Sequence, residues 1–260
     1  MTGANQGIGA AIAEALAADG AAVLATFLRL PGEHADPALP AEYARLRAQS
    51  ADDVVAGIRL AGGRVEAREA DLADPSTVPA LFDRAESVFG PVDILINNAS
   101  GWLANTFLPA RRDRFGRRQA AVDAASHDRQ FAVDARAPAL LIAEFARRHI
   151  GRNATWGRIV GLTSGGPGGF PEEVSYGAAK AAQENYTMSA AAELAAYGVT
   201  ANMVYPPVTD TGWITDSVRA AAADAGPIGR VAEPADVAEV VLLLTSERAR
   251  FITGQIIRMS

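Results

Sequence analysis

A tyrosine, a lysine and a serine stand at spacings that suit proton transfer. Tyr176 and Lys180 are four residues apart in a segment that reads as a helix, so their side chains share one helix face. Ser164 follows an apolar segment, residues 158–162, that reads as a buried strand. A cation beside a phenol favours the phenolate and lowers the pKa of the phenol. The three residues therefore predict an acid–base site at the carboxyl end of a strand.

The composition adds weight to the tyrosine–lysine pair. The chain has 24 basic residues, and Lys180 is its only lysine. An ammonium is a compact charge that can release a proton, whereas a guanidinium stays charged. Because such a pair also occurs by chance on solvated helices, the prediction depends on Ser164 and on a glycine motif elsewhere in the chain.

That motif lies at the start, where Gly3, Gly7 and Gly9 precede an alanine-rich helical pattern. Glycines allow a tight turn and close approach to a pyrophosphate, and a helix N-terminus attracts anions. The plain alternative is a glycine-rich helix entry without a ligand. In dinucleotide-binding folds the motif follows a strand, yet only two residues precede Gly3. We expect the natural polypeptide to begin a few residues before Met1, with an apolar strand.

Strands and helices alternate along the chain. The expected strands are residues 21–27, 64–72, 92–96, 158–162, 200–205 and 255–259. The expected helices begin after Gly9 and then cover residues 41–61, 75–89, 126–150, 175–197 and 234–246. This order predicts an α/β fold, a Rossmann-like doubly wound parallel sheet with helices on both faces and its first strand largely missing from the sequence. We expect one domain, residues 1–260.

Several connections carry their own expectations. Residues 30–50 look like a surface insertion. The arginine-rich residues 101–125 either receive an anionic substrate or carrier or form a solvated loop, which we favour. Residues 212–226 look like a helical excursion that would cover a substrate. Pro138 should bend the helix around it or open its hydrogen-bond ladder.

The totals exclude several classes of function. Hydrophobic residues make up 49% of the chain and charged residues 21%, which is typical of a globular protein. The net charge of −6 argues against general nucleic-acid binding, and no apolar run approaches the ~20 residues that span a bilayer. With no cysteine and three scattered histidines, we expect no metal site. No signal segment is evident, so we expect a cytoplasmic protein.

The end of the second strand bears on the choice of cofactor. In dinucleotide folds an acid there binds the ribose 2′-hydroxyl, whereas an arginine suits a 2′-phosphate. Here the strand ends in Phe27-Leu28-Arg29, without an acid. We therefore predict that NADP(H) is favoured over NAD(H), with Arg29 as a contact.

Taken in order, these signals resemble the short-chain dehydrogenase/reductase family over essentially the whole chain, and within it the β-ketoacyl-acyl-carrier-protein reductase type. The segments that match its cofactor-binding motifs are Thr2, Gly3, Ala4, Asn5, Gln6, Gly7, Ile8 and Gly9; Asp71 and Leu72; Asn97, Asn98 and Ala99; and Pro206, Thr209 and Thr211. Two positions in these motifs depart from the family, with Ser100 and Pro207 in place of glycine.

The resemblance implies roles for the opening three residues. Tyr176 would be the general acid, Ser164 would polarise a carbonyl oxygen, and Lys180 would hold the nicotinamide ribose and lower the Tyr176 pKa. Tyr176 and Lys180 would thus also contact the cofactor. The implied activity is hydride transfer between NAD(P)H and a carbonyl or alcohol, free or carrier-bound.

The family's fourth catalytic residue, an asparagine, aligns with Asp134. In one alternative, its carboxylate would pair with Lys180 and hinder proton return to Tyr176. In the other, its main-chain carbonyl would hold a water that contacts Lys180, and the side chain would take no part. We favour the second alternative, since Arg136 offers the carboxylate another partner.

Other functions stay open at this stage. The same fold serves as a dinucleotide sensor or scaffold without turnover, or as a reductase of an imine or pterin C=N bond. The alanine-rich helices at residues 126–150 and 175–197 are too apolar for full exposure to water. Together with the resemblance, they predict a homo-oligomer, a tetramer.

Overall fold

A parallel β-sheet forms the centre of the molecule. The computed structural model describes residues 1–30, 40–109, 111–165, 168–225 and 227–260, so residues 31–39 of the predicted insertion lie outside it. The strands of the sheet are β1 (Ala22–Phe27), β2 (Arg64–Glu69), β3 (Ile94–Asn97), β6 (Gly157–Leu162), β7 (Val199–Tyr205) and β8 (Ile256–Arg258). Neighbours run parallel, in the order β2-β1 on one side and β3-β6-β7-β8 on the other.

The first residues of the chain join these two groups of strands. The Thr2 N–H donates to the Ile96 carbonyl at 3.1 Å, and the Ala4 N–H donates to the Thr26 carbonyl at 2.9 Å. The Thr26 N–H in turn donates to the Met1 carbonyl at 2.9 Å. Residues 1–4 thus stand where the carboxyl end of a central strand would lie, which is the reduced first strand expected from the sequence.

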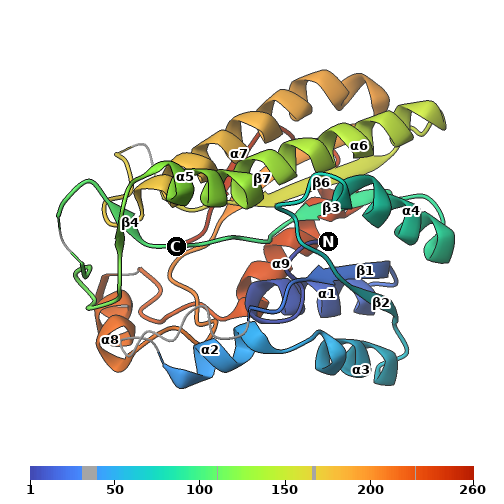
Figure 1. Cartoon of the computed structure of the whole chain (residues 1–260). Coiled ribbons are helices and arrows are strands. Elements are labelled where there is room, and N and C mark those ends of the chain that lie inside the picture. The colour runs from blue at the N-terminus through green and yellow to red at the C-terminus, as the bar shows by residue number, and fades with distance from the viewer. Residues whose placement is uncertain (31–39, 110, 166–167, 226) are drawn as a thin grey trace.

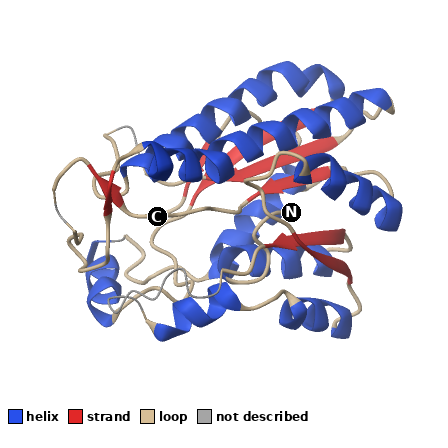
Figure 2. Ribbon diagram, viewed as in Figure 1, coloured by secondary structure: helices blue, strands red, loops and turns tan. Residues whose placement is uncertain are grey.

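Helices cover both faces of the sheet (Figures 1 and 2). One face carries α1 (Gly7–Ala18), α3 (Asp52–Leu60) and α9 (Pro234–Thr245), and the other carries α4 (Thr77–Phe89), α6 (Ala137–Gly151) and α7 (Val174–Leu194). On β6, Val160 and Leu162 pack into the first core while Ile159 packs into the second, because successive side chains point to opposite faces. The doubly wound fold is confirmed. Within the described residues, no helix is both long and apolar enough to span a bilayer.

The predicted helix over residues 41–61 is wrong, because it is two helices, α2 (Ala41–Ala48) and α3. Gln49 is extended, with φ −84° and ψ 156°, and its carbonyl accepts from the Asn5 side chain at 3.0 Å. Asp52 and Asp53 then begin the second helix, where acidic side chains favour the N-terminal dipole.

The helix predicted over residues 126–150 is also divided. It begins at α5 (Ala124–Phe131), which Asp123 caps, passes through a π-helical segment, η1 (Ala132–Arg136), and continues as α6. Pro138 is the second residue of α6. Because it has no N–H, it cannot donate to the carbonyl four residues earlier, and the predicted opening of the ladder lies just before it.

The remaining elements flank the open end of the sheet. The connection over residues 101–125 contains a short parallel pair, β4 (Asn105–Thr106) and β5 (Ala120–Ala121), that the sequence did not reveal. The excursion after Thr211 does contain a helix, α8 (Asp216–Ala225). Two 3-10 turns, η2 (Ala195–Tyr197) and η3 (Glu247–Ala249), follow α7 and α9.

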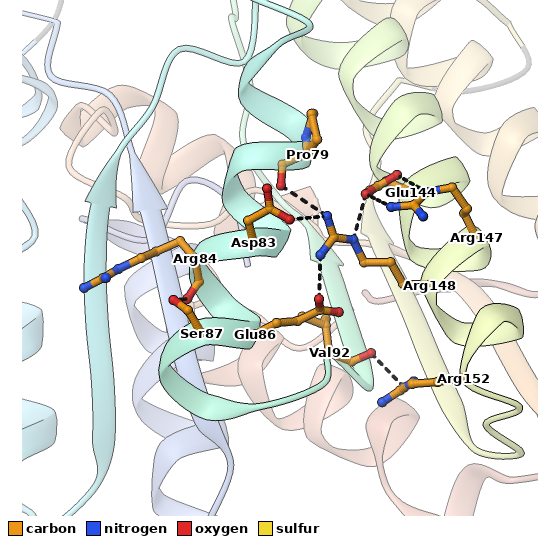
Figure 3. A network of polar contacts seen from close by, with 10 residues as sticks. All are labelled: Pro79, Asp83, Arg84, Glu86, Ser87, Val92, Glu144, Arg147, Arg148 and Arg152. Atoms are coloured by element: carbon orange, nitrogen blue, oxygen red, sulfur yellow. Dashed lines mark hydrogen bonds and ion pairs between the residues drawn. The ribbon is translucent and has the colours of Figure 1, made fainter.

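An arginine-centred cluster clamps α4 to α6 (Figure 3). The Arg148 guanidinium, from α6, contacts Asp83 at 2.6 Å and Glu86 at 2.5 Å on α4, and Glu144 at 2.7 Å on its own helix. It also donates to the Pro79 carbonyl at 3.4 Å. These contacts fix the helices on one face of the sheet, remote from its carboxyl edge.

Candidate active site

The carboxyl ends of the parallel strands open into a cavity of about 870 Å³. This is the edge at which open α/β sheets bind ligands. The predicted site residues in its walls are Gly3, Asn5, Gln6, Gly7, Ile8, Gly9, Asp71, Leu72, Asn98, Ala99, Ser164, Tyr176, Pro206, Thr209 and Thr211. Most residues chosen from the sequence therefore meet around one space.

The glycine motif forms a tight cradle at one end of the cavity. A Cβ added to Gly9 would lie 1.8 Å from the Gly3 carbonyl oxygen, so only glycine fits there. Gly3 has φ +67°, and its carbonyl and that of Thr2 accept from the Asn98 side chain at 2.9 and 3.0 Å. Helix α1 begins directly behind, at Gly7, which leaves its first N–H groups free for an anion. The cradle fits the pyrophosphate of a dinucleotide.

Arg29 and Asn97, which were both expected to bind cofactor, do not line the cavity. Arg29 forms an exposed bidentate pair with Glu69 at the end of β2, with contacts of 2.7 and 3.0 Å. Asn97 is buried, and its carbonyl accepts from the Gln183 side chain at 3.3 Å. Asn97 therefore packs behind the cavity, and Arg29 points to the neighbouring strand.

Tyr176 and Ser164 both line the cavity wall, and hydrogen bonding to Ser164 is one influence on the pKa of Tyr176. Burial raises the pKa of Tyr176 well above its ordinary value, and the charges of Asp134 and Glu173 raise it further, although the Ser164 bond lowers it. The expected lowering by Lys180 does not prevail. The phenol is thus held in its protonated form at neutral pH.

Lys180 is buried behind Tyr176, with its ammonium 5.8 Å from the centre of the tyrosine ring. It lies 3.1 Å from Asp134 Oδ1, and it donates to the Leu162 carbonyl and to Gln183 Oε1, each at 3.0 Å. Lys180 is not among the residues of the cavity wall, so the structure does not show the side chain in the space where a ribose would bind.

The Asp134 side chain pairs with Lys180 and not with Arg136, the partner that the sequence offered. Its other oxygen, Oδ2, accepts from the Gly101 N–H at 2.8 Å and from Gln130 Nε2 at 2.5 Å. Arg136, the alternative partner, donates instead to the Ala73 carbonyl at 2.5 Å. The carboxylate therefore joins the lysine to the chain that follows β3.

The connection over residues 101–125 holds the start of helix α7. Asn105 accepts from the Ser175 N–H at 2.9 Å and donates to the Ser175 hydroxyl at 2.7 Å, one residue before Tyr176. Arg117 is buried and bridges Asp113 at 2.6 Å and Glu173 at 2.7 Å. A solvated loop is therefore the wrong description of this part. No sequence motif marks the contacts to helix α7, because Asn105 and Arg117 lie more than fifty positions away from Ser175 and Glu173.

Known proteins resemble the chain over nearly its whole length. A family model described as Enoyl-(Acyl carrier protein) reductase matches residues 3–260. Cis-4-hydroxycyclohexanecarboxylate dehydrogenase of Sinomonas cyclohexanicum is 36% identical over 261 residues, which cover 99% of this chain and 92% of that protein. The 3-oxoacyl-[acyl-carrier-protein] reductase FabG of Escherichia coli (strain K12) is 30% identical over 263 residues, which cover 100% and 94%.

A solved structure gives the same result in three dimensions. The angucycline C-6 ketoreductase LanV, crystallised with NADP, superposes with a TM-score of 0.79 at 30% identity, covering 99% of this chain and 91% of that one. The chain thus belongs to the short-chain dehydrogenase/reductase family, where it resembles the ketoacyl-carrier-protein reductase type, and is an NAD(P)H-dependent oxidoreductase acting on a carbonyl or alcohol.

Proposed function

We propose that this enzyme reduces the ketone group of a bulky cyclic compound with NADPH. The observation that carries the proposal is the placement of Ser164 and Tyr176 together in the wall of a cavity whose other end fits a pyrophosphate. The preference for NADPH is supported by the missing acid after Phe27 and by the NADP in the LanV structure. A bound NADPH would supply the hydride.

The protein's own groups handle the proton. We assign Ser164 to donate a hydrogen bond to the carbonyl oxygen, and Tyr176 to transfer its proton to that oxygen as the carbon is reduced. The high pKa of Tyr176, caused first by burial, keeps this proton in place at neutral pH. A protonated phenol holds the proton that reduction of a carbonyl requires, which agrees with the reductive direction.

Lys180 and Asp134 support this transfer from behind. The ammonium lies close to the phenol ring, and the carboxylate fixes it there while balancing its charge. We assign Lys180 to return a proton to Tyr176 after each turnover, with Asp134 as its positioning residue.

Aromatic side chains shape the substrate end of the cavity. Trp102, Phe115, Phe170 and Trp213 line it, and three of them surround the buried Arg117 guanidinium at 5.0 to 5.8 Å. Because Arg117 is already paired with two carboxylates, we do not assign it to an anionic substrate. The rings favour a flat or alicyclic apolar skeleton. The cyclic compounds named for two similar proteins support this class.

We further propose a cytoplasmic homotetramer. Leu140 and Ile150 on α6 and Tyr186 on α7 expose apolar side chains, and Phe251 is 97% exposed. Association would remove this area from water. Light scattering should give the mass of four chains, and a monomer mass at micromolar concentration would contradict the proposal.

The activity is tested by following nicotinamide absorbance while the protein is mixed with NADPH and a panel of cyclic and linear ketones. We expect turnover with cyclic ketones. Tyr176→Phe should lower kcat by about 10² to 10⁴, the usual range for general acid catalysis, while NADPH binding persists. Full turnover by this variant would remove Tyr176 from the mechanism.

A further inference from the structure

Helix α2, from the insertion after β1, closes one end of the cavity. The Leu30 N–H donates to the Arg47 carbonyl at 3.0 Å, and the Asn5 side chain donates to the Gln49 carbonyl at 3.0 Å. The helix is thus tied to the end of β1 and to the glycine motif. Tyr43 and Arg47 project from it into the same cavity wall as the last residues of β1.

Arg47 is a buried cation without a counterion among the described residues. It is only 8% exposed, and its guanidinium lies 5.5 Å from the Tyr43 ring centre and donates to the Tyr43 hydroxyl at 2.9 Å. Its Nε is buried with no hydrogen-bond partner, and it forms no ion pair with a described carboxylate. A buried charge left in this state costs stability unless a ligand balances it.

Neither described carboxylate of the cavity wall pairs with Arg47. The cavity wall contains Asp71, which accepts from the Ala73 N–H at 2.8 Å, and Glu173, which pairs with Arg117 at 2.7 Å. Arg29, the cation expected from the sequence, is held by Glu69 outside the wall. Arg47 lines the cavity beside the end of β1, the side on which we place the adenosine ribose of a dinucleotide.

We propose that Arg47, oriented by Tyr43, recognises the 2′-phosphate of the adenosine ribose. The planar guanidinium fork matches the oxygens of a phosphate, and burial strengthens the contact. The inference rests on the proposed preference for NADP(H) and locates that preference on the inserted helix. It replaces Arg29, the residue that the end of the strand indicated.

The test compares ligands that differ only in the 2′-phosphate. NADPH and NADH, and adenosine 2′,5′-bisphosphate and 5′-AMP, are titrated calorimetrically into wild type and Arg47→Met. We expect the variant to lose about tenfold to a hundredfold in affinity for the two 2′-phosphorylated ligands, the usual range for a charge-assisted contact, and less than about threefold for the others. Arg47→Lys, which keeps the charge and loses the fork, should fall in between.

Two matched controls belong to the same experiment. Arg45→Met changes an exposed arginine of the same helix that pairs with Glu42, and Arg29→Met removes the residue favoured by sequence. Neither should change the ratio between the two classes of ligand. Melting temperatures identify misfolding, and if Arg47→Met fails to fold, Arg47→Lys and Tyr43→Phe decide the question.

Two results would overturn the inference. Equal weakening of all four ligands would place Arg47 at the pyrophosphate, and a selective loss in Arg29→Met would return the 2′-phosphate to the strand end. Failure of the proposed reaction is a separate outcome, since selective NADPH binding through Arg47 can be measured in a protein that reduces no ketone of the panel.

Discussion

Two cations in this molecule are held by carboxylates under opposite conditions. Lys180 is 2% exposed and faces a single carboxylate, Asp134, which is fully buried. Arg148 lies between α4 and α6 and faces three carboxylates, of which Asp83 is 71% exposed. Near the cavity, one buried ammonium is paired with one buried carboxylate. In the other cluster, one guanidinium is paired with three carboxylates, of which at least one is in contact with water.

The difference separates a functional arrangement from a structural one. Burying an ion pair costs desolvation that its attraction often fails to recover, so stability alone is a weak reason for the Lys180–Asp134 pair. The Arg148 cluster joins two helices with three carboxylates around one guanidinium, and its most exposed contact, to Asp83, contributes little. We therefore expect changes at the first site to affect both turnover and folding, and changes at the second to affect folding alone.

The largest effect should come from Lys180→Met. This change leaves the buried Asp134 carboxylate without its cation, which should lower the free energy of unfolding by about 3–5 kcal/mol. Turnover should fall by about 10² or more, because proton return to Tyr176 is lost. Urea unfolding and NADPH consumption measure the two quantities.

A second substitution separates the two effects of Lys180→Met. Lys180→Met combined with Asp134→Leu removes both charges, so it should regain most of the stability and none of the turnover. If Lys180→Met alone were as stable as wild type, the Lys180–Asp134 pair would not be desolvated as described.

Asp134→Asn should have a smaller effect with a defined sign. Burial is the main cause of the high Tyr176 pKa, and the Asp134 charge is the next, so removing that charge lowers the pKa of the phenol. Alcohol oxidation needs the phenolate, so its rate should begin to rise at a lower pH than in wild type. We also expect turnover at neutral pH to fall by about tenfold or more, since the Lys180 ammonium loses its counterion. An unchanged pH–rate profile would indicate that Asp134 acts through its main-chain carbonyl and not through its carboxylate.

Local patterns were enough to predict the strands of the parallel sheet, several of its helices and the closeness of Ser164, Tyr176 and Lys180 in the fold. Apolar runs and glycine spacing depend on neighbours in sequence, which is why β6 and α7 lie close to their predicted positions. The break after α2 depends on Asn5, which takes the Gln49 carbonyl from more than forty residues away. No periodicity within residues 41–61 carries that information.

The unexpected partners of Arg29 and Asp134 have the same origin. The register of β1 against β2 places Phe27 opposite Glu69, which brings a carboxylate beside Arg29. Arg47 reaches the cavity only because an insertion folds back over the strand. The sequence offers Arg136, a near neighbour, as the partner of Asp134, but in the fold Arg136 donates to the Ala73 carbonyl. Partners across strands and loops decide these positions.

At the structural cluster, Glu144→Gln should lower the free energy of unfolding at pH 7 by about 1–2 kcal/mol, the value of a charge-assisted hydrogen bond, without changing kcat. The Glu144 side chain is 14% exposed. Its pKa is lowered to about 2, mainly by the hydrogen bond to Arg147 and further by the one to Arg148, while desolvation acts in the opposite direction. A lowered carboxyl pKa gives stability that is present above its unfolded value of 4.5 and lost as pH falls toward 2. The difference between wild type and variant should therefore shrink over that range in unfolding curves measured at successive pH values. A difference that stays constant down to pH 2 would contradict the role of the charge.

The smallest effect should come from Asp83→Asn in the same cluster. Asp83 contacts Arg148 at 2.6 Å, as close as Glu144 does, but its side chain is 71% exposed and solvent screens the pair. Arg148 also keeps Glu86, Glu144 and the Pro79 carbonyl, so the guanidinium stays in place when Asp83 is neutralised. We expect the free energy of unfolding to change by less than about 0.5 kcal/mol, with kcat unaffected. Urea unfolding of Asp83→Asn and Glu144→Gln should be measured together, since each change removes one negatively charged partner of Arg148. If Asp83→Asn costs as much as Glu144→Gln, exposure does not set the strength of these contacts, and the contrast drawn between the solvated cluster and the buried Lys180–Asp134 pair fails.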